Sequence, residues 1–315
     1  MQVIRGLHNL CAAHRGCVAT IGNFDGVHLG HRAVLANLQA KAHELGLPTT
    51  VITFEPQPLE FFAPDRAPAR LTRVREKLLA LQDAGVERVV LLEFNAKLAQ
   101  MEAADFVQQL LVDGLDVRYL FVGDDFRFGC ERQGDIELLR QVGREHGFEV
   151  ENRQTFMVGD ARVSSTRIRE ALSQGDLEAA ESYLGRPYMI CGRVAHGYER
   201  GRTIGFPTAN IDLHRKVSPL QGVYAVSVHG LPQGVLSGVA NIGNRPTVEG
   251  DNRYLLEVHL FDFAEQIYGA HLQVEFCKKL RDEQRFESFE ALRQQIELDA
   301  RTAREFFGLP PAVEQ

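Results

Sequence analysis

Two histidines, His28 and His31, stand three residues apart where a polar loop ends and a predicted helix begins. Imidazoles at this place would lie near the positive N-terminus of the helix, and Gly30 would let a ligand approach the backbone. That arrangement suits a polyphosphate, because it stabilises charge building up on a phosphorus atom under attack without a covalent step. Two other interpretations stay open for this pattern by itself. A metal pair would need a third ligand, and none stands out nearby; two ordinary surface histidines are the more common case.

A second helix start, Ser164-Ser165-Thr166-Arg167-Ile168-Arg169, has similar potential. Hydroxyls and backbone N–H groups at a helix N-terminus form an anion site, and Arg169 lies one turn into the helix, within reach of a phosphate. Taken singly, Ser164 and Ser165 are more commonly helix caps. The sequence contains neither a P-loop nor the glycine fingerprint of classical dinucleotide-binding folds. Nucleotide binding here would therefore follow another pattern.

The segment 201–210, Gly-Arg-Thr-Ile-Gly-Phe-Pro-Thr-Ala-Asn, combines a glycine-rich loop with oxygen-bearing side chains. Arg202 offers a phosphate contact. Thr208 and Asn210 are two residues apart, so on an extended segment their side chains face the same way. An oxygen atom from each could hold Mg²⁺, which keeps several waters and binds substrate phosphates. The alternative is a loop in which these two side chains satisfy their own turn.

Glu257 lies within the predicted strand 255–261 and is the candidate general base of the second half. A functional glutamate would accept a proton from an attacking hydroxyl. The alternative is a carboxylate that simply faces solvent, which is the common case on a strand. His259 lies on the same strand face and is the rival base.

The elements that must position these groups alternate in the first half of the chain. The expected strands are 18–21, 49–54, 88–92 and 119–122, and the expected helices are 31–45, 77–84, 104–111 and 136–146. This alternation predicts an α/β domain with a doubly wound, Rossmann-like parallel sheet. Such sheets bind ligands beyond the carboxyl ends of their strands, where we expect two polar loops, 22–26 and 123–126, to form one site. Tight turns are the alternative for both loops.

The pattern changes near Gly185-Arg186-Pro187. Two short helices, 166–173 and 177–184, precede this point, and strands dominate after it, over 189–194, 222–228, 235–242 and 255–261. We therefore expect two domains, residues 1–184 and 185–315, the second a small antiparallel β-barrel. The barrel domain is expected to end in an amphipathic helix whose apolar stripe comprises Phe289, Leu292, Ile296, Ala303 and Phe307.

The composition fits two ordinary soluble domains. The 315 residues are 44% hydrophobic and 24% charged, and the net charge of −7 argues against a general nucleic-acid binder. The five cysteines are scattered and odd in number, as in a reducing compartment. Arg5, His8 and His14 interrupt any apolar N-terminal stretch, and no run is long enough to span a bilayer. We expect a cytoplasmic monomer or weak homo-oligomer with neither a membrane nor a nucleic-acid partner.

Four motifs of the first half resemble the nucleotidyltransferase superfamily and, within it, the bacterial bifunctional FAD synthetases. These motifs are Gly22–His31, Ser164–Arg169, Phe54–Pro58 and Val122–Gly129. The resemblance implies transfer of AMP from ATP to the phosphate of FMN, which gives FAD and releases pyrophosphate.

The same resemblance implies roles for single residues. His28 and His31 would hold the ATP phosphates and act in catalysis. The ATP site as a whole would comprise Gly22, Asn23, Phe24, Asp25, His28, His31, Ser164, Ser165, Thr166 and Arg169. Pro56, Pro58 and Asp125 are assigned to the flavin side, with the adenosine side as the open alternative.

The second half resembles riboflavin kinases over its full length. Gly205–Asn210 is similar to the magnesium and ATP motif of that family, and Gly222–Ala225 and Ala240–Thr247 resemble its barrel strands. The resemblance implies transfer of the γ-phosphate of ATP to the terminal ribityl hydroxyl of riboflavin, with Glu257 as the catalytic base and Mg²⁺ as the metal. The implied kinase residues are Gly201, Arg202, Thr203, Thr208 and Asn210 toward ATP, Thr208 and Asn210 toward Mg²⁺, and Arg281 and Glu283 toward the flavin.

The expected function is therefore a bifunctional enzyme that uses ATP to make FMN from riboflavin and FAD from FMN. A chain in which only the kinase half is active is one alternative, and the intact histidine and serine motifs argue against it. A flavin carrier is another, but it would need neither a magnesium pair nor a base. A generic adenylyltransferase would leave the barrel unexplained.

Overall fold

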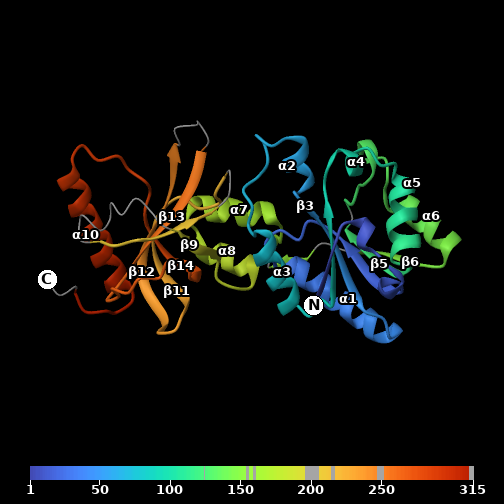
Figure 1. Ribbon diagram of the computed structural model, residues 1–315, viewed down its shortest axis with the longest axis horizontal. Coiled ribbons are helices and arrows are strands. Elements are labelled where there is room, and N and C mark those ends of the chain that lie inside the picture. Colours follow the sequence, from blue (N-terminus) through green and yellow to red (C-terminus); the bar gives the residue numbers. More distant parts are fainter. Residues whose placement is uncertain are drawn as a thin grey trace. The chain divides into compact units, whose positions relative to one another are not determined.

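The computed structural model describes residues 1–123, 125–153, 156–158, 161–195, 206–213, 217–246 and 252–311. The chain folds as two compact units (Figure 1). Unit 1 comprises Met1–Pro68 and Thr72–Ser165, and unit 2 comprises Ala69–Leu71 and Thr166–Gln315.

Unit 1 is built on a six-stranded parallel sheet with the strand order β1-β4-β3-β2-β5-β6. Its strands are β1 (Gln2–Arg5), β2 (Cys17–Ile21), β3 (Thr49–Glu55), β4 (Arg88–Glu93), β5 (Val117–Gly123) and β6 (Glu149–Arg153). The four expected strands are the four central ones, β2 to β5. The edge strands β1 and β6 were not expected, because neither shows the apolar run that identifies a buried parallel strand. In β1 only Val3 and Ile4 are apolar, and in β6 charged residues alternate along the strand.

Helices connect these strands as the doubly wound topology requires. They are α1 (Leu29–Leu45), α2 (Pro58–Phe62), α3 (Val74–Asp83), α4 (Ala96–Ala99), α5 (Ala103–Phe106) continuing into the π-helical η3 (Val107–Gly114), and α6 (Ile136–His146). Short 3₁₀ turns lie at η1 (Leu7–Asn9), η2 (Ala12–His14) and η4 (Cys130–Arg132), and β7 (Met157–Val158) pairs with β8 (Ala161–Arg162). The expected helices 31–45 and 136–146 are confirmed, and Gly46 and Gly147 end them in the left-handed conformation.

The strand order changes direction beside β2, which lies between β3 and β5. From β2 the chain winds outward through β3 and β4 on one side, and β5 and β6 extend the sheet on the other side. A crevice at the carboxyl ends of the strands is expected where the winding reverses. The segments after β2 and β5, residues 22–28 and 125–126, lie at this place.

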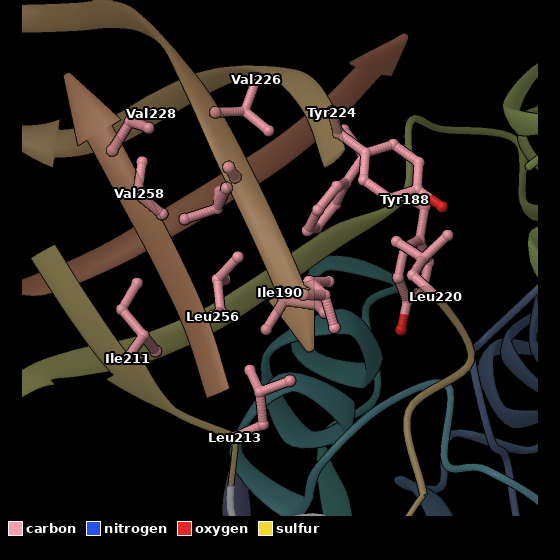
Figure 2. Packing of buried hydrophobic residues seen from close by; sticks show 14 of the residues in the cluster. Tyr188, Ile190, Ile211, Leu213, Leu220, Tyr224, Val226, Val228, Leu256 and Val258 are labelled. Atoms are coloured by element: carbon pink, nitrogen blue, oxygen red, sulfur yellow. The ribbon is translucent and has the colours of Figure 1, made fainter. Parts of the chain in front are cut away.

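Unit 2 contains a closed antiparallel barrel with the order β10-β13-β12-β11-β14-β9. Its strands are β9 (Met189–Ala195), β10 (Ala209–Asp212), β11 (Gly222–Leu231), β12 (Gly234–Pro246), β13 (Asn252–Leu260) and β14 (His271–Arg281). Alternate residues point inward and fill the barrel, among them Ile190, Ile211, Val226 and Val258 (Figure 2). The predicted small barrel is confirmed, and β10 and β14 are additional strands.

Helices α7 (Ser165–Gln174) and α8 (Leu177–Leu184) contribute to the same hydrophobic core as the barrel. Ile168, Leu172 and Leu184 are almost fully buried in that core. Leu71 joins it from the first half of the sequence, and its carbonyl oxygen accepts a hydrogen bond of 3.1 Å from the Tyr188 hydroxyl. The packed body of unit 2 therefore includes both α7 and α8. The expected boundary between the two functional domains at residue 184 stays a prediction.

The C-terminal helix α10 (Phe289–Phe306) is capped by Ser288 and packs on β11, β12 and β14. Its predicted apolar stripe is wrong at one end, because Phe289 is 61% exposed. Two polar residues are buried instead: Asp299 accepts from Arg281 at 2.7 Å, and Arg304 donates to Asp262 at 2.9 Å. These ion pairs let α10 bury charged side chains that a hydrophobic pattern assigns to solvent.

No helix within the described ranges is both long and apolar enough to cross a membrane.

Candidate active sites

The first site is built where the loop after β2 meets the N-terminus of α1. His28 is the N-cap of α1 and is buried, and its Nδ1 accepts a hydrogen bond from the backbone N–H of His31 at 3.3 Å. The two imidazoles stack with their centroids 3.6 Å apart and an interplanar angle of 16°. In the described part of the chain, no three His, Cys, Asp or Glu side chains gather as metal ligands. Because His28 caps α1, the pair lies where a helix N-terminus favours an anion.

Burial lowers the pKa of His31 well below its usual value of 6.5, and the nearby His28 and Lys77 lower it further. His31 is therefore neutral at pH 7. Its Nδ1 is buried and has no hydrogen-bond partner among the described residues. A buried polar atom without a partner is unfavourable, so a ligand that supplies one would bind with a gain at this atom.

Other elements hold the loop that leads to His28. The backbone carbonyl of Asn23 accepts from Thr53 Oγ1 at 3.3 Å, and that of Asp25 accepts from Ser165 Oγ at 2.9 Å. The side chain of Asp25 is buried, and its Oδ1 accepts from Thr72. The structure thus brings Ser165, from the second predicted motif, to the loop of the first motif, 140 residues away.

The remaining residues of the serine motif divide between the units. Ser164 lies in unit 1 and is partly buried. Thr166 and Arg169 lie in unit 2, where Arg169 Nε donates to the carbonyl oxygen of Ala69 at 2.5 Å. The predicted contact of Thr166 and Arg169 with the ATP phosphates stays a prediction.

The residues assigned to the flavin side follow β3 and β5. Pro56 comes directly after β3, and Pro58 is the first residue of α2. Asp125 is highly exposed, and its carboxylate lies 3.9 Å from Arg162. Both segments follow the carboxyl end of a strand of the parallel sheet, and the contacts of these residues with a substrate stay predictions.

Sequence reasoning missed two residues of this site. Lys77 on α3 is 1% exposed, and its Nζ lies 3.5 Å from Thr53 Oγ1. Thr72 is buried two residues before the start of α3. A lysine on a helix is usually solvated, so no pattern in the sequence marked Lys77 as buried.

The second site is a row of polar residues across three neighbouring strands of the barrel. Glu257 on β13 stands directly opposite Asn210 on β10 and directly opposite Asn241 on β12. Directly opposed residues of antiparallel strands share one face of the sheet, so these three side chains lie side by side. Asn241 was expected only as part of a barrel strand, and the register of β12 adds it to the site.

A cavity of about 210 Å³ lies at the Asn210 end of this row. Thr208 and Asn210 line it together with residues of the segment after β13, including Phe263 and Tyr268. Asn210 Nδ2 donates to the carbonyl oxygen of Thr208 at 3.2 Å, which directs the amide oxygen away from that contact. A hydroxyl and an amide oxygen are donors of the kind that Mg²⁺ accepts, so the residues present fit the expected metal.

His259, the rival base, lies two residues along β13 from Glu257. Its Nδ1–H donates to the carbonyl oxygen of Pro207 at 2.9 Å, and its ring packs edge-on against Phe206 and Phe261. Burial is the main cause that lowers the pKa of His259. The hydrogen bond to Pro207 thus holds the imidazole of His259 between the rings of Phe206 and Phe261.

The expected flavin-side residues are Arg281, the last residue of β14, and Glu283, two residues beyond it. Arg281 forms a bidentate ion pair with the buried carboxylate of Asp299 on α10. Glu283 is exposed, and its carboxylate lies against Gly243 of β12. Gly201, Arg202 and Thr203 lie outside the described residues, so their predicted ATP contacts stay predictions.

Comparisons with known proteins match both halves. Residues 10–167 match the family model of FAD synthetase, and residues 184–307 match that of riboflavin kinase. A bifunctional riboflavin kinase/FMN adenylyltransferase of Escherichia coli (strain K12) is 56% identical over 310 residues, which cover 98% of this chain and 99% of that protein. The protein of the same name from Pseudomonas fluorescens is 55% identical over 304 residues, covering 96% and 97%.

One solved structure, described as a macrolide-efflux protein from Streptococcus pneumoniae, shares the architecture of both units. It has a TM-score of 0.80 and 30% sequence identity, and the match covers 96% of this chain and 99% of that one. The two family models and the full-length relatives decide the assignment. The chain belongs to the bifunctional riboflavin kinase/FMN adenylyltransferase family and makes FMN and FAD.

Proposed function

We propose that FMN is adenylylated at the N-terminus of α1. A phosphate oxygen of FMN attacks the α-phosphorus of ATP, the bond from this phosphorus to the β-phosphate oxygen breaks, and pyrophosphate leaves. His28 and His31 hold the phosphates, and the loop with Gly22, Asn23 and Asp25 lies beside them. The observation that supports this most directly is the buried Nδ1 of His31 at a helix N-terminus, which has no hydrogen-bond partner among the described residues.

Replacing either histidine tests this assignment. His28→Ala or His31→Ala should lower the rate of FAD formation from FMN on the order of 10²-fold, as the loss of other preorganised polar groups does. Riboflavin phosphorylation, measured in the same samples, should stay near normal, because its proposed residues lie in unit 2. An equal loss of both activities would contradict the assignment of two separate sites.

We propose that riboflavin is phosphorylated at the polar row of the barrel. Glu257 accepts the proton of the ribityl hydroxyl while the hydroxyl oxygen forms a bond to the γ-phosphorus of ATP and ADP leaves. Mg²⁺, bound through Thr208 and Asn210, would neutralise phosphate charge. The alignment of Glu257 with Asn210 supports this assignment, because it sets the base beside the proposed metal ligand.

Glu257→Gln tests the base, because it keeps the shape and removes the basic oxygen. It should lower riboflavin phosphorylation by about 10²- to 10⁴-fold and leave the adenylylation of supplied FMN unchanged. His259→Ala is the control, since His259 shares the strand face. If the glutamine variant kept its turnover and the His259 variant lost it, the role of base would pass to the histidine.

A further inference from the structure

The loop between β2 and α1 holds a backbone conformation that needs support. Phe24 and Val27 lie in the left-handed region, with φ angles of 48° and 42°. This region is unfavourable for residues other than glycine, and for a β-branched residue such as Val27 it is a true outlier. Such a conformation persists only where the surroundings over-determine it, and it is often found at active sites.

Thr72 supplies support of this kind through three hydrogen bonds. Its hydroxyl accepts from the backbone N–H of Gly26 at 2.9 Å and donates to Asp25 Oδ1 at 3.2 Å. Its own backbone N–H donates to the same Oδ1 at 2.9 Å. Thr72, Asp25 and Gly26 are all buried. We call this set of three bonds the Thr72 brace.

The brace holds Asp25 and Gly26, which lie between Phe24 and Val27, the two non-glycine residues of the loop with a positive φ. Without these hydrogen bonds to Asp25 and Gly26, the backbone at Phe24 and Val27 could relax toward more common conformations. His28 follows Val27 directly and sets the start of α1, so a relaxed loop would move its imidazole away from His31. Displacements of about 1 Å at a reacting centre can lower a rate about 10²-fold.

We propose that Thr72 is a positioning residue for adenylyl transfer, holding the loop of residues 22–28 so that His28 meets the ATP phosphates. This inference rests on the role proposed above for His28. It also gives Asp25 a structural role in the site, because its carboxylate accepts the two hydrogen bonds from Thr72 that hold the loop.

The chain contains a matched control at the opposite end of the same sheet. Thr49, the first residue of β3, makes the same three kinds of bond to Glu87. Its hydroxyl accepts from Glu87 N–H at 2.9 Å and donates to Glu87 Oε2 at 3.4 Å, and its own N–H donates to that oxygen at 2.8 Å. Because ligands bind at the carboxyl ends of parallel strands, Thr49 lies at the end away from the proposed site.

The experiment compares Thr72→Val, Thr72→Ser, Thr49→Val and His28→Ala in the full chain. Thr72→Val removes the two hydroxyl bonds with little change of shape and should lower kcat for FAD formation about 10- to 100-fold, with KM for FMN little changed. Thr72→Ser presents the same hydroxyl and should stay within about threefold of the wild type. The Thr49→Val variant should adenylylate FMN at the wild-type rate. Thermal unfolding and riboflavin phosphorylation, measured on each sample, report on folding.

Three results would overturn the proposal. One is normal FAD formation by Thr72→Val while His28→Ala has lost it. Another is an equal loss of FAD formation in Thr72→Val and Thr49→Val, which would mean that the loss comes from removing any buried threonine hydroxyl of unit 1. The third is a Thr72→Ser variant as poor as Thr72→Val. Undiminished activity of His28→Ala is a distinct outcome, which removes the proposed role of His28 and the reason for the brace with it.

Discussion

At the residue scale, burial and nearby positive charge together set the protonation state of His31 in the first site. Lys77 is almost fully buried, and its charge acts on the neighbouring imidazole of His31, which stacks on a second imidazole. Burial and nearby positive charge both disfavour the imidazolium form, so both lower the pKa of His31. His31 therefore stays neutral as the pH falls past 6.5, where an exposed histidine becomes protonated.

Lys77→Met tests this account, because it keeps most of the side-chain length and removes the charge. We expect the pKa of His31 to rise toward the usual value, since one cause that lowers it is gone. The measurement is the NMR titration of the His31 ring between about pH 5 and 8, a window that spans the usual pKa. Lys41→Met is the control, because Lys41 lies on the same helix as His31 and pairs with Glu44 at 2.9 Å. A His31 pKa that is the same in the Lys77 variant and the wild type would contradict the account.

At the scale of elements, strand register decides which side chains of the barrel share a site. Asn210, Glu257 and Asn241 come from three different strands, and antiparallel pairing places them in one row. Closing a barrel fixes the stagger of every strand, so a slip of one residue would turn Glu257 to the other face. The end of β14 brings a further carboxylate, that of Glu283, against β12 at Gly243.

Gly243→Ala uses this contact to test the flavin-side role predicted for Glu283. A methyl group at position 243 would overlap the Glu283 carboxylate, which is the exposed end of a flexible side chain and can swing away. We expect little loss of stability, a severalfold rise in KM for riboflavin, and unchanged adenylylation of FMN. Glu283→Ala should give the same rise in steady-state kinetics. An unchanged KM in both variants would remove Glu283 from the flavin side.

At the scale of the whole molecule, packing and sequence pattern divide the chain at different places. The pattern changes near Arg186, whereas α7 and α8 share their core with the barrel. Ile168, Leu172 and Leu184 are each at most 1% exposed there. Burying one such side chain contributes roughly 1.5–3 kcal/mol, so these two helices matter to the stability of unit 2.

Two fragments separate function from stability at this junction. The fragment from Gly185 onward carries the proposed kinase residues, so we expect it to phosphorylate riboflavin and make no FAD. The fragment from Thr166 onward should do the same and unfold at a temperature higher by roughly 5 °C or more, because it keeps the buried faces of α7 and α8. Calorimetry and product analysis of both fragments check this. Equal melting temperatures would mean that the helices add nothing to the barrel, and a folded longer fragment without kinase activity would contradict independent domains.

The amino-acid sequence by itself determined the elements whose pattern is local: the apolar central strands, the capped helices α1 and α6, and the motifs around His28, Ser164 and Thr208. It also led to the correct family, because those motifs are contiguous in the chain. Periodicity and capping depend on residues a few positions apart, so they can be recognised without a fold.

Only the tertiary structure decided which distant residues meet. Thr72 reaches Asp25 across 47 residues, and Asn241 joins Glu257 through the register of β12. Asp299 and Arg304 are buried although both are charged, because each forms an ion pair with a residue outside α10. Each of these contacts depends on how separate elements pack, and a buried polar group is stable only where packing supplies its partner. No local pattern carries that information.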